Sequence, residues 1–173
     1  SYYRLITFKE KNIPIGTAYD YSINDIKLSS FNASYVGLSV KGLDSVFYNG
    51  SNNTYYNNGN LSSSKLLINN KIEGIFIEYK ESGEIDCTVM YNNDLRIGKE
   101  KCYGDTGKVI GTQYWVNGIL NGTQTWYHDT GEVKTVSNHI DGKRQGEYYG
   151  YWKNGNIKIK GTWVDDKQHG EQF

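Results

Sequence analysis

Glycine recurs in this chain with a period of 24 residues, in two phases at once. A tyrosine follows five residues after most glycines of the first phase, and no insertion or deletion interrupts five successive copies. Registers that stay locked over five copies indicate a repeat array, whose architecture follows from one unit and from how that unit stacks on its neighbour. The first phase is Gly50, Gly74, Gly98, Gly122, Gly146 and Gly170, and the second is Gly59, Gly83, Gly107, Gly131 and Gly155.

One unit, residues 98–121, has the pattern of a β-hairpin. Its first strand ends at Asp105-Thr106-Gly107, whose glycine suits the left-handed position of a type I turn with a G1 bulge. Centring the loop on Thr106 places Tyr103 opposite Val109. The same spacing predicts tight loops at Asn57–Gly59, Glu81–Gly83, Asp129–Gly131 and Lys153–Gly155, and the pairs Tyr55 with Leu61, Tyr79 with Ile85, Tyr127 with Val133 and Tyr151 with Ile157.

The second strand of each unit places large residues at odd positions, such as Val109 and Trp115, which predicts one buried face. It ends at a second turn signal, Asn117-Gly118 in this unit. No segment has a sustained apolar period of 3.6 residues, so helix should be nearly absent. The predicted fold is all-β: an elongated single-layer antiparallel sheet of tandem 24-residue hairpins, on the order of 48 Å long at about 4.8 Å per strand.

The repeats divide the chain into two regions. Five repeats are expected at residues 50–73, 74–97, 98–121, 122–145 and 146–169, followed by the start of a sixth at Gly170. Residues 1–49 should hold a degenerate repeat, because Gly16 and Tyr21 keep the spacing of Gly74 and Tyr79. An insertion within residues 23–47 would then cap the end of the sheet.

Composition excludes several classes of protein. The chain has 19 basic and 19 acidic side chains, so no global field draws it to nucleic acid or to an anionic membrane. No apolar run approaches the roughly 20 residues of a membrane helix, and the first residues do not form a signal peptide. A location in the cytoplasm is favoured, and export is the alternative should a signal peptide have been removed. The sequence does not predict the oligomeric state.

Neither the cysteines nor the histidines predict a metal site. Cys87 and Cys102 lack zinc-site spacing, although their midpoint near residue 94.5 predicts that they are cross-strand neighbours, with a bond left open. His128, His139 and His169 fall at different repeat offsets, so we expect solvated or partly packed histidines.

Catalytic residues and cofactors are not expected either. Asp105-Thr106-Gly107 and Asp129-Thr130-Gly131 match the triplet of aspartic proteases. The position of the aspartate is occupied by Asn57, Glu81 and Lys153 in the other repeats, which indicates a residue that favours a turn rather than a catalytic carboxylate. No serine or cysteine nucleophile stands in a recognisable setting with a base, and the glycine-rich loop, lysine and metal-binding acids of a kinase are missing from the sequence.

The repeats resemble a known family. Gly161-Thr-Trp163-Val-Asp-Asp166-Lys-Gln-His169-Gly170-Glu resembles the MORN (membrane occupation and recognition nexus) repeat, and residues 122–134 are similar to its bacterial variant. The resemblance extends over residues 50–173 and implies an elongated sheet of hairpins. It also implies roles known for such repeats: scaffolds, lipid-associated modules beside phosphatidylinositol phosphate kinase domains, and antitoxins.

Two surfaces are candidates for binding. Aromatic residues in a shared phase predict an interaction face, comprising Tyr79, Tyr91, Tyr103, Trp115, Tyr127, Tyr151 and Trp163. A basic cluster is predicted at Lys143, Arg144, Lys158 and Lys160. We expect a non-catalytic module that binds another protein of unknown identity; the alternatives are a phospholipid or phosphoinositide adaptor with weak membrane contact, an antitoxin-like partner of a bacterial toxin, and a carbohydrate binder.

Overall fold

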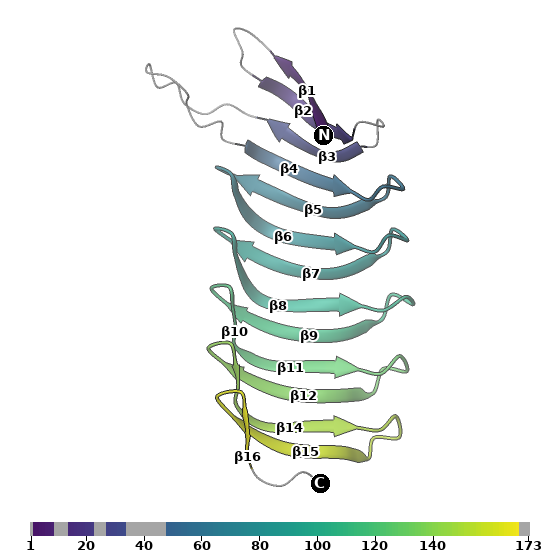
Figure 1. Ribbon diagram of the computed structural model, residues 1–173, viewed down its shortest axis with the longest axis vertical. Coiled ribbons are helices and arrows are strands. Elements are labelled where there is room, and N and C mark those ends of the chain that lie inside the picture. Colours follow the sequence, from purple (N-terminus) through teal and green to yellow (C-terminus); the bar gives the residue numbers. More distant parts are fainter. Residues whose placement is uncertain (1, 9–13, 23–26, 34–47, 170–173) are drawn as a thin grey trace. The chain divides into compact units, whose positions relative to one another are not determined.

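A computed structural model of the chain describes residues 2–8, 14–22, 27–33 and 48–169 (Figure 1). The described residues form β strands and turns without any helix, which confirms the all-β prediction. Most of the predicted insertion at residues 23–47 and the predicted start of a sixth repeat at Gly170 lie outside the described residues, and the division at residue 49 stays a prediction.

The chain separates into two compact units, Ser1–Glu84 and Ile85–Phe173. In the first unit, six strands follow one another in chain order, and each pairs antiparallel with the next. These strands are β1 (Tyr2–Phe8), β2 (Pro14–Ser22), β3 (Lys27–Ala33), β4 (Tyr48–Tyr55), β5 (Leu61–Ile68) and β6 (Lys71–Tyr79).

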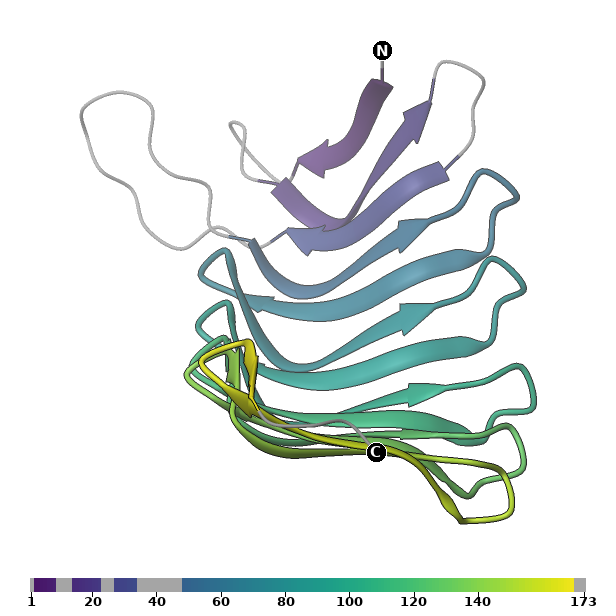
Figure 2. The ribbon, with the colours of Figure 1, turned by 60° about the horizontal axis from the view of Figure 1, so that its bottom comes forward.

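The second unit is also an antiparallel sheet in chain order, and its long strands are curved along their length (Figure 2). The strands that follow one another across this sheet are β7 (Ile85–Asn92), β8 (Leu95–Tyr103), β9 (Val109–Val116), β11 (Gly122–Tyr127), β12 (Val133–Ile140), β14 (Gly146–Tyr151), β15 (Ile157–Val164) and β16 (Lys167–His169). Two short strands, β10 (Ile119–Leu120) and β13 (Lys143–Arg144), pair with the ends of β9 and β12.

The tight loops have the predicted geometry. Gly107 has a φ of 72°, and its N–H donates to the Gly104 carbonyl at 2.9 Å, while the Gly104 N–H donates to the Lys108 carbonyl at 2.9 Å. This is the type I turn with a left-handed glycine that the sequence predicted. The expected pairs Tyr55 with Leu61, Tyr103 with Val109, Tyr127 with Val133 and Tyr151 with Ile157 are confirmed, whereas Tyr79 with Ile85 would join the two units and stays a prediction.

The second turn of each repeat, which joins one hairpin to the next and which we name the long turn, has two central residues, both with positive φ. In the third repeat these are Asn117, with a φ of 48°, and Gly118, with a φ of 80°, as type I′ turns require. The Gly118 N–H donates to the carbonyl of Arg96 at 2.8 Å, in the region of the preceding long turn. Gly142 makes the equivalent bond to Leu120 at 2.9 Å. Each of these two turns is therefore tied to the one before it.

A β-bulge beside four of the five predicted tight loops changes which side chains share a face. In the hairpin of β8 and β9 the register moves from Tyr103 opposite Val109 to Cys102 opposite Gly111, so Ile110 is left over. The side-chain alternation therefore slips by one residue beyond the bulge. The expectation that Val109 and Trp115 share one face is wrong for this reason.

The second unit consequently has two distinct faces. We name the face that carries Glu100 the glutamate face and the opposite one, which carries Tyr103, the tyrosine face. The sheet has no covering layer within this unit, and Val89 is its one buried hydrophobic residue among those described. The glutamate face includes Cys87, Tyr91, Arg96, Glu100, Cys102, Gln113, Trp115, Gln124, Trp126, Ser137, His139, Tyr148 and Trp163.

Candidate functional site

The predicted aromatic face is divided between the two sides of the sheet. In the second unit, Tyr91, Trp115 and Trp163 lie on the glutamate face, whereas Tyr103, Tyr127 and Tyr151 lie on the tyrosine face. The placement of these six side chains on a single face is wrong because each bulge reverses the alternation between the tyrosine and the tryptophan of a repeat. All seven aromatic residues of the predicted row, Tyr79 of the first unit included, are half-buried.

A ladder of polar side chains crosses the glutamate face. The Glu100 carboxylate, only 3% exposed, accepts a hydrogen bond from Trp115 Nε1 at 2.8 Å and another from Gln113 Nε2. Gln124 Nε2 donates to Gln113 Oε1 at 2.7 Å, and Ser137 Oγ donates to Gln124 Oε1 at 3.5 Å. Within the described part of the chain, no lysine, arginine or histidine forms an ion pair with Glu100.

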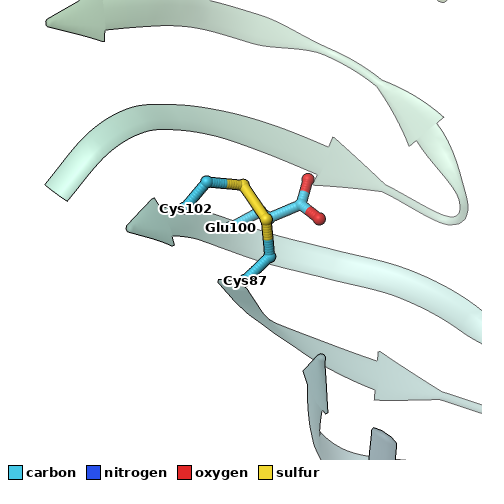
Figure 3. A group of neighbouring side chains, drawn as sticks. All are labelled: Cys87, Glu100 and Cys102. Atoms are coloured by element: carbon cyan, nitrogen blue, oxygen red, sulfur yellow. A yellow bond between two sulfur atoms is a disulfide. The ribbon is translucent and has the colours of Figure 1, made fainter. Parts of the chain in front are cut away.

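The two cysteines meet on the same face. Cys87 lies directly opposite Cys102, which confirms the predicted neighbourhood, and the two form a disulfide with a Cα–Cα distance of 4.1 Å. Glu100 precedes Cys102 by two residues on β8, so both side chains project to one side. Figure 3 shows the Glu100 carboxylate beside the disulfide, and one donor atom from each of the three residues lies within 4.8 Å of the others.

The predicted basic cluster does not assemble. Lys143 Nζ lies 3.7 Å from Asp165, Arg144 Nε 3.0 Å from Asp166, and Lys160 Nζ 3.0 Å from Glu147, so three of its four members face an acid. Hydrogen bonds from the Arg144 backbone and guanidinium lower the pKa of the Asp166 carboxyl. Lys158 is the second residue of β15, and its Nζ is 4.5 Å from the centre of the Trp152 ring. The prediction grouped these four residues because they are close in sequence, but each of them has a different partner in the structure.

The histidines are scattered, but one of them is buried. His128 Nε2 lies 3.0 Å from the carbonyl of Tyr151 at the edge of the tight loops. His139 is only 6% exposed, contrary to the expected solvated or partly packed state, and burial lowers its pKa. The repeat explains this, because residues 24 positions before and after it are Trp115 and Trp163. His139 therefore occupies a slot built for a large side chain.

A hollow near the tight loops of the last two repeats was not expected from the sequence. We call it the lysine hollow; it has a volume of about 710 Å³. A second hollow of about 360 Å³ adjoins it, since Lys134 and Thr135 line both. The lysine hollow combines aromatic rings with basic side chains, and its lining residues are His128, Lys134, Thr135, Tyr148, Tyr151, Trp152, Lys153, Lys158 and Ile159.

Charge and exposure distinguish this hollow from the rest of the sheet. It is lined by His128 and three lysines, and no carboxylate is among its lining residues. The Trp152 side chain is 53% exposed. Lys153 Nζ contacts Asp129 at 2.7 Å outside the lysine hollow, and this contact lowers the pKa of the Asp129 carboxyl. An exposed tryptophan is typical of a binding surface, and the three lysines around it give this one a positive charge.

Comparison with known proteins finds similarity to a repeat family and to solved structures. The MORN repeat variant family matches residues 120–141 and 144–165, which is one tandem pair of repeats. A chain of the solved structure titled "Crystal structure of GtfA/B complex bound to UDP and GlcNAc" is similar over 73% of this chain and 26% of that chain, with 10% identity and a TM-score of 0.28. This chain thus spans about a quarter of that one. Curated proteins gave no match.

Membrane crossing by a helix finds no support in the described residues, where no helix of sufficient length and apolarity occurs.

Proposed function

We propose that this chain, whose residues 120–165 are tandem MORN-variant repeats, is a non-catalytic module that binds an acidic segment of another protein at the lysine hollow. The observation that carries the proposal is the coincidence, in one hollow, of exposed aromatic surface and positive charge without a lining carboxylate. A single-layer sheet leaves such a surface free for a partner because no second layer of this unit covers it.

The aromatic side chains supply the anchoring surface. Trp152 is more than half exposed, and Tyr148 and Tyr151 line the hollow beside it. Large, rigid rings in a concave site lose little conformational entropy on binding and are frequent hot spots of protein interfaces. The volume of about 710 Å³ accommodates a few side chains of a partner rather than a whole domain.

The lysines select the charge of the partner. Lys134, Lys153 and Lys158 surround the aromatic rings, and an acidic segment would complement them. The ion pair between Lys153 and Asp129 is exposed at both ends, so it contributes little and a carboxylate of the partner competes with it. Because Lys134 also lines the adjoining hollow, a bound segment extends from one repeat to the next.

Selection of displayed peptides tests this proposal. A library of random peptides on phage is selected against the full chain, and the recovered peptides are synthesised and titrated by isothermal calorimetry. We expect enrichment of Asp and Glu, and loss of binding to the triple variant Lys134→Gln, Lys153→Gln, Lys158→Gln. The matched control replaces three exposed lysines outside the hollow with glutamine and should bind as the parent does: Lys101, Lys108 and Lys167.

Two outcomes would overturn the assignment. If the recovered peptides bind the triple lysine variant as tightly as they bind the parent chain, the peptide contact lies outside the lysine hollow. Sedimentation of the chain with phosphatidylserine vesicles at physiological salt, lost in the triple lysine variant, together with no acidic peptide, would assign the hollow to anionic lipid instead.

A further inference from the structure

We propose that reduction of the Cys87–Cys102 disulfide releases a zinc site in which both thiolates and the Glu100 carboxylate are the protein ligands. The three residues project from the same face of two neighbouring strands (Figure 3). Donor atoms of all three already lie within 4.8 Å of one another. In the disulfide state the sulfurs are bonded to each other, so the site exists only after reduction.

The register of the sheet preorganises the ligands. Cys102 and Glu100 are two residues apart on β8, and Cys87 on β7 faces Cys102 directly. A tetrahedral zinc ion with Zn–S bonds of about 2.3 Å needs sulfurs about 3.7 Å apart. Once the S–S bond is cut, rotation of the two side chains separates the sulfurs without moving either strand. A water molecule completes the coordination in the fourth position.

Glu100 supplies the strongest argument for a cation. Its carboxylate is 3% exposed and accepts N–H groups from Gln113 and Trp115, but within the described residues it forms no ion pair. A buried carboxylate with no positive partner is costly, and a divalent ion at the sulfurs would offset that cost. The same two N–H donors fix the carboxylate, as outer hydrogen bonds do around metal ligands.

The ligand set favours zinc over other metals. Thiolates bind Zn²⁺ and Cu⁺ well, whereas calcium and magnesium prefer oxygen alone. A carboxylate is a good third ligand for Zn²⁺ but a poor one for the softer Cu⁺. Two thiolates and one carboxylate also carry three negative charges, which a divalent ion balances better than a monovalent one.

The chemistry balances with a dithiol as the reductant. Thiolate exchange transfers two electrons to the disulfide; the dithiol becomes a cyclic disulfide, and Cys87 and Cys102 become two thiols. Zinc then displaces the two thiol protons and binds both sulfurs as thiolates. Exchange with a small-molecule disulfide would re-form the Cys87–Cys102 bond: that disulfide is reduced to two thiolates, and the zinc ion is released, so occupancy of the site reports the redox state of its surroundings.

Cobalt provides the spectroscopic test. The full chain is reduced with a water-soluble phosphine, which becomes the phosphine oxide, freed of excess reductant, and titrated with Co²⁺ without oxygen. We expect one equivalent to bind, with thiolate-to-cobalt charge-transfer bands and the intense visible bands of tetrahedral cobalt, and zinc should displace it. The oxidised chain should show neither. Identical weak spectra for reduced and oxidised protein would overturn the proposal.

Variants assign the ligands. Glu100→Gln should weaken Co²⁺ binding at least about tenfold, a loss at least as large as that seen for residues around metal ligands. Cys87→Ser should remove the charge-transfer bands. Glu132→Gln, an exposed carboxylate in a tight loop, is the control and should bind as the parent does. Parent-like binding by Glu100→Gln would remove Glu100 from the site.

X-ray absorption on the zinc-loaded, reduced parent chain keeps the test valid should Glu100→Gln fail to fold. A first shell of two sulfurs and two oxygens is expected. A shell of four sulfurs, or one without sulfur, would overturn the proposal.

Discussion

The guanidinium of Arg144 lies 3.7 Å from the centre of the Trp163 ring, and 48 residues earlier Arg96 covers Trp115 in the same way at 4.9 Å. Both arginines come from the long-turn end of one repeat and reach the tryptophan of the next. The contact therefore joins successive repeats on the glutamate face. A flat cation on an aromatic ring also covers apolar surface that the single-layer sheet would otherwise expose.

A double-mutant cycle should detect this contact between repeats. We expect the pair Arg144→Gln and Trp163→Leu to show a coupling of about 0.5–1 kcal/mol in the free energy of unfolding. The full cycle is needed because Arg144 also donates a hydrogen bond to Asp166. Arg144→Gln removes that bond with or without Trp163, so its contribution cancels in the coupling energy. Urea unfolding followed by circular dichroism gives the four free energies. Strictly additive effects would mean that the stacking contributes nothing.

Gly111 is required by the ring that lies on it. A Cβ built at Gly111 would come within 2.3 Å of Trp126 Cζ3, so Gly111→Ala must displace the indole. We expect a loss of about 1–3 kcal/mol in the free energy of unfolding, as for other overpacked sites. In the background Trp126→Ala the same glycine substitution should cost much less. An equal cost in both backgrounds would trace the effect to the backbone.

Reduction of the disulfide should destabilise the second unit. The sequence separation of Cys87 and Cys102 is 15 residues, for which chain-entropy arguments give about 3 kcal/mol. We expect the urea midpoint to fall on reduction, and zinc to recover part of the loss. The double variant Cys87→Ser, Cys102→Ser should respond to neither reductant nor zinc. A midpoint that does not move on reduction would show that the unfolded chain gains little freedom.

The buried His139 should make stability depend on pH. Burial lowers its pKa, against a smaller opposing effect of Asp166, so the unfolded chain takes up this proton at higher pH than the folded chain does. Its contribution is complete above the unfolded pKa of about 6.5 and is lost as pH falls toward the folded pKa. The free energy of unfolding should therefore decrease between pH 7 and 5, less steeply in His139→Gln. Equal slopes in both proteins would contradict this.

Local spacing in the sequence was enough to predict the fold. The tight-loop glycines, the Asn and Asp residues of the long turns and the tyrosine opposite each aliphatic residue depend only on neighbours within one hairpin. Cross-strand contact of Cys87 and Cys102 followed from the same arithmetic. Repeat contacts are short in sequence, which is why a single unit contained most of the information.

The faces and the sites were harder to predict. The extra residue of a bulge has no characteristic residue type, so the sequence does not reveal it. Counting positions from the glycines therefore placed Trp115 on the same face as Tyr103, which is wrong. The buried ladder at Glu100 needed the corrected register, after which Gln113 and Gln124 fall into line. The sequence did not single out Lys134, and it placed Lys158 in a basic cluster with Lys143, Arg144 and Lys160. Only the three-dimensional arrangement brings Lys134 and Lys158 together around Trp152.

The backbone–backbone hydrogen bonds between the long turns of the second unit all point the same way along the chain. Gly118, Gly142 and Asp166 each donate a backbone N–H to a carbonyl that lies earlier in the sequence. As the ribosome releases the chain from its N-terminus, each of these three turns finds its acceptor already built. Folding can then keep pace with synthesis, one hairpin at a time, without waiting for residues that have yet to be made.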